Sequence, residues 1–147
     1  MATAVADLHD VYYRRHWDVD QRFRQMVLAE ATAFLAAFDP ARDEMWLLAS
    51  PRGIAGSVAI MGGAESARLR WLIVDPVAQG RGFGKELLAR AVAFCGSRFR
   101  TVGLFTFAGL ERAVTLYERT GFVLQEEHVD DRWGPPIVER TYELRLR

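Results

Sequence analysis

The first forty residues carry apolar side chains at helical spacing. Residues 6–16 predict a short helix that ends in "YYRRHW", and residues 20–38 predict a longer one. Asp18 or Asp20 can cap the start of the second helix, and Pro40 lies just beyond its end. Its apolar face consists of Phe23, Met26, Val27, Ala31, Phe34, Leu35 and Phe38.

The pattern changes to that of strands after residue 40. "MWLLAS" (45–50) and "IAGSVAI" (54–60) are separated by "PRG", which is typical of a hairpin. "ARLRWLIV" (67–74) alternates at first and then ends in a continuous apolar run. We therefore expect the second half of this strand to be buried on both faces.

Helices and strands alternate in the rest of the chain. A glycine-rich turn leads into a helix over 82–96, with an apolar stripe at Leu87, Leu88, Ala91, Val92 and Cys95. The further elements expected are a strand at 101–107, a helix within 109–121 that ends at Gly121, and strands at 122–127 and 137–147. The order α-α-β-β-β-α-β-α-β-β predicts an α+β domain around a mixed sheet.

Composition favours one soluble globular domain. The chain has 147 residues, of which 50% are hydrophobic and 26% are charged. It shows no repeat or linker, so we expect a single domain over residues 1–147. Lys plus Arg and Asp plus Glu number 19 each, and this balance argues against a nucleic-acid partner.

The chemistry-bearing residues outside the glycine turn are few. Cys95, the one cysteine, excludes an internal disulfide, and its place on an apolar helix face predicts a buried thiol. His9, His16 and His128 lack metal-ligand spacing, so we expect no metal. No apolar run reaches membrane-spanning length and no signal-peptide core is present, which predicts a cytoplasmic protein without a membrane partner.

The glycine turn "QGRGFGKE" (79–86) invites comparison with phosphate-binding loops. A dinucleotide fingerprint that starts at Gly80 needs its third glycine at Lys85. A triphosphate loop that ends at Gly84 needs its first glycine at Gln79 and a hydroxyl at Glu86. Both templates fail.

A third pattern, Q/R-x-x-G-x-G/A, is matched by Gln79, Gly82 and Gly84. Here the chain resembles the GNAT superfamily of N-acetyltransferases, whose pyrophosphate loop has this form. "AVTLYERTGF" (113–122) resembles that family's later helix, which carries a tyrosine and ends in Gly-Phe. The resemblance implies a mixed, mostly antiparallel sheet flanked by helices, and acetyl-CoA as cosubstrate.

Longer stretches are most similar to the GNAT domains that are joined to MarR-type regulators. These stretches are residues 12–40, 45–60 and 126–147. Two features depart from the family pattern. "MATAVAD" gives little indication of the strand that usually opens such domains, and Thr106 and Phe107 stand where an asparagine often contacts the cofactor.

The resemblance also implies roles for individual residues. Backbone groups near Leu72, Ile73 and Val74 would polarise the thioester carbonyl. The loop Gln79, Gly80, Arg81, Gly82, Phe83, Gly84 and Lys85 would hold the pyrophosphate. Tyr117 matches the family's general acid, although spacing alone favours a core aromatic at that position.

The acceptor side is less defined by the sequence. Glu65, Glu126, Glu127 and His128 are candidates for a general base by chain region only, and the sequence favours a solvated surface group at each of these positions. Arg70 is a candidate for holding a carboxylate of the acceptor, although the sequence favours a surface strand charge whose aliphatic stem is packed. Trp133, in the loop between the last two strands, is a candidate wall that the front helices would face.

These observations predict an N-acetyltransferase that moves an acetyl group from acetyl-CoA to a primary amine of a small molecule or peptide, by direct transfer in a ternary complex. The alternative is a non-catalytic acyl-CoA sensor or interaction module. A plain α+β domain with a chance glycine turn is a third reading. The acceptor stays open, and a homodimer is compatible with the sequence.

Overall fold

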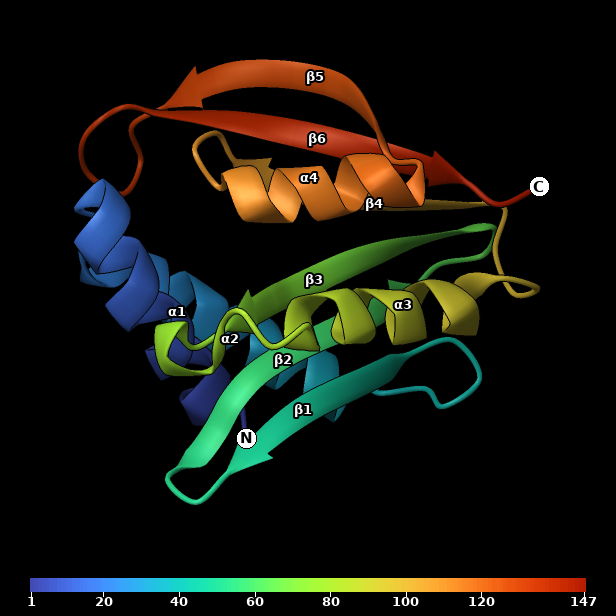
Figure 1. Ribbon diagram of the computed structural model, residues 1–147, viewed down its shortest axis with the longest axis horizontal. Helices are drawn as coiled ribbons and strands as arrows, with labels where there is room; N and C mark the ends of the chain where they lie inside the picture. Colours follow the sequence, from blue (N-terminus) through green and yellow to red (C-terminus); the bar gives the residue numbers. More distant parts are fainter.

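The computed structural model describes residues 1–147 as four α-helices, a short 3₁₀ turn and six strands (Figure 1). Their order matches the predicted one. The elements are α1 (Ala2–Trp17), α2 (Gln21–Ala36), β1 (Glu44–Ser50), β2 (Gly53–Gly62), β3 (Ser66–Val74), η1 (Pro76–Ala78), α3 (Phe83–Cys95), β4 (Thr101–Phe107), α4 (Glu111–Thr120), β5 (Val123–Asp130) and β6 (Ile137–Arg145).

The six strands form one mixed sheet in the order β1-β2-β3-β4-β6-β5. All neighbouring pairs are antiparallel except β3 and β4, which are parallel. A parallel neighbour requires a crossover connection, and α3 supplies it between β3 and β4. The expected mixed, mostly antiparallel α+β fold is therefore confirmed.

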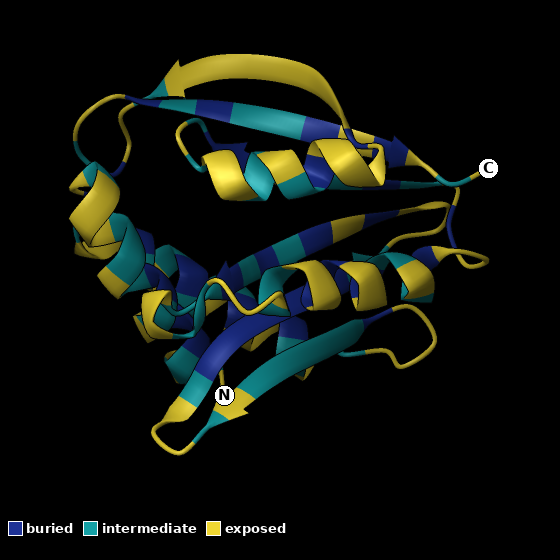
Figure 2. Cartoon of the chain, viewed as in Figure 1, coloured by how far each residue is buried: buried dark blue, intermediate teal, exposed yellow.

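Helices cover both faces of the sheet, because alternate side chains of a strand point to opposite faces. Val58 and Ile60 of β2 belong to the core beneath α3 and α4. Ala59 between them belongs to the core beneath α1 and α2. Figure 1 shows α3 in front of the sheet and α1 and α2 behind it. Figure 2 shows β5, the edge strand, exposed along nearly its whole length.

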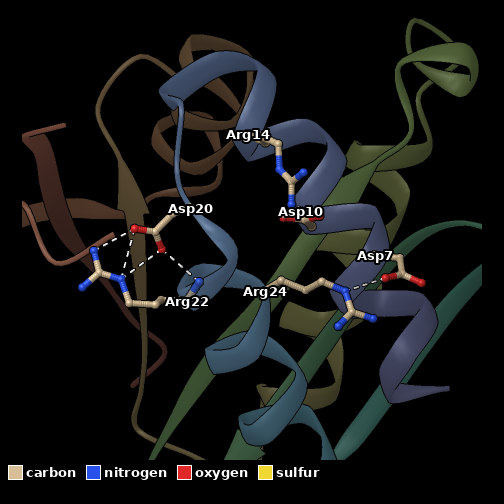
Figure 3. Close-up of polar contacts among 6 residues, drawn as sticks. All are labelled: Asp7, Asp10, Arg14, Asp20, Arg22 and Arg24. Carbon is tan, nitrogen blue, oxygen red and sulfur yellow. Dashed lines mark hydrogen bonds and ion pairs between the residues drawn. The ribbon is translucent and has the colours of Figure 1, made fainter. Parts of the chain in front are cut away.

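Figure 3 shows polar contacts of α1 and α2, one of which joins the two helices. The Asp20 carboxylate caps α2 by accepting a hydrogen bond from the Arg22 N–H at 2.9 Å. Of the two caps that the sequence allowed, Asp20 is therefore confirmed. Arg24 of α2 reaches Asp7 of α1 at 2.7 Å. Such exposed pairs contribute about 0–1 kcal/mol each, so the pairing of the helices depends mainly on their buried apolar faces.

Three expectations needed correction. The first helix begins at Ala2 rather than residue 6, and "MATAVAD" is helical and forms no strand, because Val5, Ala6 and His9 bury a face against the fold. β5 extends to Asp130 rather than ending at residue 127. The end of β3 is not buried on both faces, since Leu72 and Val74 stay half-buried beside a cavity.

No helix has both the length and the apolar character needed to cross a membrane.

Candidate active site

The sheet opens between its two parallel strands. The pairing of β3 with β4 runs from Ser66↔Thr101 to Leu69↔Leu104 and then stops. Figure 1 shows the two strands diverging beyond this point. A cavity of about 1010 Å³ occupies the opening and is lined by β3, β4, the glycine turn, α1, α2, α4 and the β5–β6 loop.

A bulge in β3 marks the start of the opening. The register against β2 shifts between Ser57 and Ala59, and Trp71 has φ 55°, which is unusual for a residue with a Cβ. The bulge places Arg70 and Trp71 on the same side of the strand. The Arg70 guanidinium pairs with Glu30 of α2, and the Trp71 ring lies 5.6 Å from that of Phe34.

The pairing of Arg70 overturns the idea that this guanidinium holds a carboxylate of the acceptor. Arg70 lines the cavity, but Glu30 of the protein already neutralises it. Burial lowers the pKa of Arg70 from its ordinary value, and the neighbouring carboxylate compensates the buried charge. We therefore assign Arg70 a structural role between β3 and α2.

The bulge also decides which backbone groups face the opening. The Asp75 N–H donates to Ala55 O of β2 at 2.7 Å. Alternation along a strand then turns the N–H groups of Leu72 and Val74 to the opposite edge, which β4 has left. Leu72, Ile73 and Val74 all line the cavity. Unpaired strand amides at this edge can donate to a carbonyl oxygen of a bound molecule.

The glycine turn presents a row of free amides to the same cavity. None of the six backbone N–H groups from Gly80 to Lys85 donates to another group of the chain. The first N–H groups of α3 have no acceptor within the helix, and the helix dipole adds partial positive charge there. Such a row is suited to an anion with several oxygens.

Two glycines of this turn adopt the left-handed backbone region. Gly80 has φ 83° and Gly82 has φ 81°, and a Cβ at either would find open space. The requirement for glycine is therefore conformational, and the space above the turn is free for a ligand. Gly84, by contrast, faces inward, where a Cβ would lie 3.6 Å from Leu116 Cδ1.

The side chains of the turn have two roles: one holds the turn in place, and another supplies a positive charge. Gln79 donates from Nε2 to Val74 O at 3.0 Å and thereby ties the turn to the end of β3. Phe83 and Lys85 line the cavity, whereas Arg81 is exposed and does not. The Gln79 side chain thus holds the loop in place, and Lys85 supplies a full positive charge near the free amides.

Tyr117, for which the sequence allowed either a core position or a place in the site, is in both. It is 4% exposed and belongs to the core beneath α4, yet it also lines the cavity. Its hydroxyl makes no hydrogen bond within the chain and is not among the fully enclosed polar atoms without a partner, so it opens onto the cavity. Burial raises the pKa of Tyr117 well above its ordinary value, which keeps the phenol protonated at neutral pH.

The far end of the cavity is enclosed by the front helices and the β5–β6 loop. Trp133, the expected wall, is buried and lines the cavity. Its backbone carbonyl accepts the Asp20 N–H at 2.8 Å, so the loop is attached to the turn between α1 and α2. Tyr12, Tyr13 and His16 of the predicted "YYRRHW" segment line the same cavity.

His9, which the sequence brought forward only as a possible metal ligand, lines the cavity. Its Nδ1 lies 2.8 Å from Val5 O, and because a carbonyl only accepts, Nδ1 carries the proton. Burial lowers the pKa of His9 to about 4, so the ring is neutral at pH 7. The spacing of His9, Tyr13 and Trp17 by four residues was a signal that they share one helix face.

The candidate bases do not lie at the site. Glu65, Glu126, Glu127 and His128 are all exposed, and none lines the cavity. Glu127 instead pairs with Arg140 on the neighbouring strand at 2.7 Å. The hypothesis of a base from these chain regions is therefore wrong.

Two further groups lie outside the cavity. Cys95 is fully buried, and burial raises the pKa of its thiol to about 11, so it is no nucleophile at neutral pH. His128, Asp130 and Glu139 approach within 4.8 Å of one another. Arg132 pairs with both carboxylates of that cluster and supplies its positive charge.

Comparison with known proteins places this geometry in a family. Residues 41–124 match the model of an acetyltransferase (GNAT) domain. The chain belongs to the GNAT acetyltransferase family. The matched residues include β1 to β4, the glycine turn and α4, so the split sheet and the amide row both lie within the shared GNAT region.

Individual relatives agree with this assignment. The mycothiol acetyltransferase of Cellulomonas flavigena is 41% identical over 75 residues, which are 50% of this chain and 21% of that protein. The aligned half of this chain thus spans about a fifth of the length of that relative.

Solved structures show the same fold at low sequence identity. An acetyltransferase from Streptococcus agalactiae has a TM-score of 0.74 at 20% identity, over 99% of this chain and 92% of that one. A structure from Salmonella typhimurium, described with its cofactor acetyl-CoA, has a TM-score of 0.70 at 14% identity, over 99% and 88%. Spermidine N-acetyltransferase from Vibrio cholerae, in complex with CoA and spermine, has a TM-score of 0.62 at 21% identity, over 81% and 74%.

Proposed function

We propose that this GNAT domain transfers an acetyl group from acetyl-CoA to a primary amine by direct attack within a ternary complex. The observation that carries the proposal is the row of six unpaired N–H groups from Gly80 to Lys85, all of which except that of Arg81 belong to residues that line the cavity at the split of the sheet. The pyrophosphate of the cosubstrate matches this row in charge and in its number of acceptor oxygens. Residues 1–147 would act as one domain.

The cosubstrate would follow the opening from the glycine turn to the strands. With the pyrophosphate on Gly80 to Lys85, the pantetheine arm would run along β3. Its thioester carbonyl would then reach the N–H groups of Leu72 and Val74, which β4 leaves unpaired. Ile73, between them, contributes to the wall.

The reaction would begin with the lone pair of the amine attacking the thioester carbon. The carbonyl oxygen takes up negative charge, which the strand amides stabilise. The C–S bond then breaks as the carbonyl re-forms, and the sulfur leaves with the bonding pair. Tyr117, protonated and open to the cavity, would donate a hydrogen bond and then its proton to that sulfur, and would recover a proton from solvent.

The acceptor must also lose its ammonium protons, one before attack and one after it. An alkylammonium has a pKa of about 10.4 in water, and an apolar cavity lowers that value. The lining contains a single carboxylate, Glu111, at the start of α4. We infer that the protons leave through water and that no carboxylate on β3 takes them.

No covalent acyl-enzyme is needed for this route. Cys95, the one cysteine, is fully buried and does not line the cavity. Direct transfer in a ternary complex is therefore the mechanism that the arrangement of side chains favours.

Titration of the purified protein with acetyl-CoA by calorimetry tests the proposal. We expect saturable binding, competition by free CoA, and release of CoA thiol when an accepted amine is added. Absence of binding at millimolar acetyl-CoA would contradict it. Binding without thiol release from a broad amine panel would instead favour the alternative of an acyl-CoA sensor.

The identity of the acceptor is not transferred from relatives, because their names point to different acceptors, mycothiol in one and spermidine in another. We also propose that the chain is most similar to the GNAT domains joined to MarR-type regulators, because of residues 12–40, 45–60 and 126–147. A cytoplasmic location and a homodimer remain part of this proposal.

A further inference from the structure

The acceptor end of the cavity is built almost entirely from aromatic rings. They come from α1, α2, β4 and the β5–β6 loop, which are four separate parts of the chain. The rings that carry the argument are His9, Tyr13, His16, Phe23, Phe107 and Trp133.

These rings contact one another and so form a continuous wall. The Tyr13 ring lies edge-on to that of Phe107 at 5.1 Å, and the Phe23 ring lies edge-on to that of Trp133 at 5.3 Å. Phe107 and Trp133 are 5.8 Å apart. Each ring is braced by its neighbours, and the wall presents ring faces and edges at fixed positions.

The charged residues that line the cavity disfavour an acceptor with several positive charges. Glu111 is the one carboxylate among the lining residues, which also include Arg68, Lys85, Arg112 and Arg119, besides Arg70, which Glu30 neutralises. A second ammonium on the acceptor would meet no carboxylate among the aromatic rings and would lose its hydration without compensation. The excess of cations suits the phosphates of the cosubstrate instead.

His9 supplies a polar contact that carries no charge. Its Nδ1 donates to Val5 O, which leaves the lone pair on Nε2. Nε2 has no partner in the chain and is not among the enclosed polar atoms, so it is open to the cavity. The neutral Nε2 atom can therefore accept a hydrogen bond from the amino group of a substrate without forming a salt bridge.

We infer that the acceptor is an aromatic primary amine that carries no second positive charge, with its ring against Tyr13, Phe107 and Trp133. This inference rests on the proposed function, since it names the substrate class of the same site. An aromatic ring gains edge-to-face contacts in this wall that an aliphatic chain of similar size does not gain.

Steady-state release of CoA thiol from acetyl-CoA tests the inference with the full chain. The panel pairs 2-phenylethylamine and tryptamine with 2-cyclohexylethylamine and n-hexylamine, and adds spermidine and putrescine as polycations. We expect kcat/KM for the aromatic amines to exceed that for the aliphatic monoamines by about tenfold, and the polyamines to be poorer still. Equal or better turnover of spermidine would overturn the inference, as would no turnover of any aromatic amine by protein that binds acetyl-CoA.

A variant on α1 separates a wall for the acceptor from general packing. Tyr13→Leu should raise KM for 2-phenylethylamine about tenfold while the Kd for acetyl-CoA and the KM for n-hexylamine change little. Val11→Ala, on the exposed side of the same helix, is the matched control and should change neither. Equal effects of Tyr13→Leu on the KM values of both amines would contradict an aromatic acceptor. Failure of the unmodified protein to bind acetyl-CoA would instead contradict the proposed function itself.

Discussion

Arg132 and Glu139 form an ion pair between the surface and the interior. The Nη2 atom of Arg132 lies 2.9 Å from Oε1 of Glu139, whose side chain is 0% exposed, whereas half of the Arg132 side chain is exposed. The same guanidinium lies 3.9 Å over the ring of Trp133. One arginine thus neutralises a buried carboxylate and packs on a tryptophan that lines the cavity.

Glu139 should make the stability of the protein depend on pH. Burial raises the pKa of its carboxyl above the value of about 4.3 for a free glutamate, and its Oε2 atom has no partner. Between these two pKa values the folded state binds more protons than the unfolded state, so the contribution of Glu139 to stability falls as pH rises. Urea unfolding from pH 4 to 7.5 should show that Glu139→Gln gains stability relative to the unmodified protein with rising pH.

Glu127→Gln is the control for this titration. Glu127 lies on the adjacent strand β5, is exposed and pairs with Arg140. Its removal should leave the pH dependence nearly unchanged. A stability of Glu139→Gln that falls relative to that of the unmodified protein as pH rises would show instead that the carboxylate is stabilised when ionised.

Arg132→Ala should destabilise the fold through Glu139. The substitution leaves a fully buried carboxylate without its charged partner, and we expect a loss of about 1–3 kcal/mol in the free energy of unfolding. In the Glu139→Gln background the same change should cost less than about 1 kcal/mol, because no buried charge remains. Denaturation of the two single variants and the double variant measures this coupling, and simple additivity would contradict it.

The order of elements could be predicted because its signals are local. The Asp20 cap, Pro40 after α2 and Gly121 at the end of α4 each act within a few residues, and the helical and strand periods are clear between them. The start of α1 was missed because Met1 provides no capping side chain and the first turn has no acidic residue, whereas Val5 and Ala6 of this segment are buried against the fold.

The cosubstrate side of the site was more predictable than the acceptor side. Two residues of the glycine turn need a positive φ, and the presence of glycine at these positions indicates this from the sequence alone. The bulge at Trp71 has no such signal, since a positive φ at tryptophan is imposed by the surrounding sheet. The pairing of Arg70 with Glu30 joins residues 40 positions apart, and spacing along the chain does not indicate it.

Gly82→Ala should weaken the binding of acetyl-CoA more than it weakens the fold. A Cβ at φ 81° costs about 1–2 kcal/mol of backbone strain, and the methyl group would occupy the space above the free amides. Loss of one charge-assisted hydrogen bond to phosphate corresponds to a rise in Kd of about tenfold or more. Calorimetric titration with acetyl-CoA measures this effect.

Gly53→Ala provides a matched comparison. Gly53 has φ 117° in the β1–β2 hairpin, has open space at its Cβ, and lies away from the cavity. It should lower stability by a similar amount and leave the Kd for acetyl-CoA unchanged. Similar affinities for the two variants would argue that the amides of the glycine turn do not bind the cosubstrate.

Tyr117→Phe should slow acetyl transfer by about ten- to a hundredfold and leave the Kd for acetyl-CoA nearly unchanged, because it removes only the proton donor. Since burial raises the pKa of Tyr117, the unmodified protein should lose activity from phenol ionisation only above the ordinary tyrosine value of about 10. Rates of thiol release between pH 6 and 10.5 check both statements.

Tyr142→Phe is the control, because Tyr142 packs beside Tyr117, with ring centroids 6.2 Å apart, but does not line the cavity. Equal rates and pH profiles for Tyr117→Phe and the unmodified protein would show that Tyr117 belongs to the core alone and that the departing sulfur takes its proton from water.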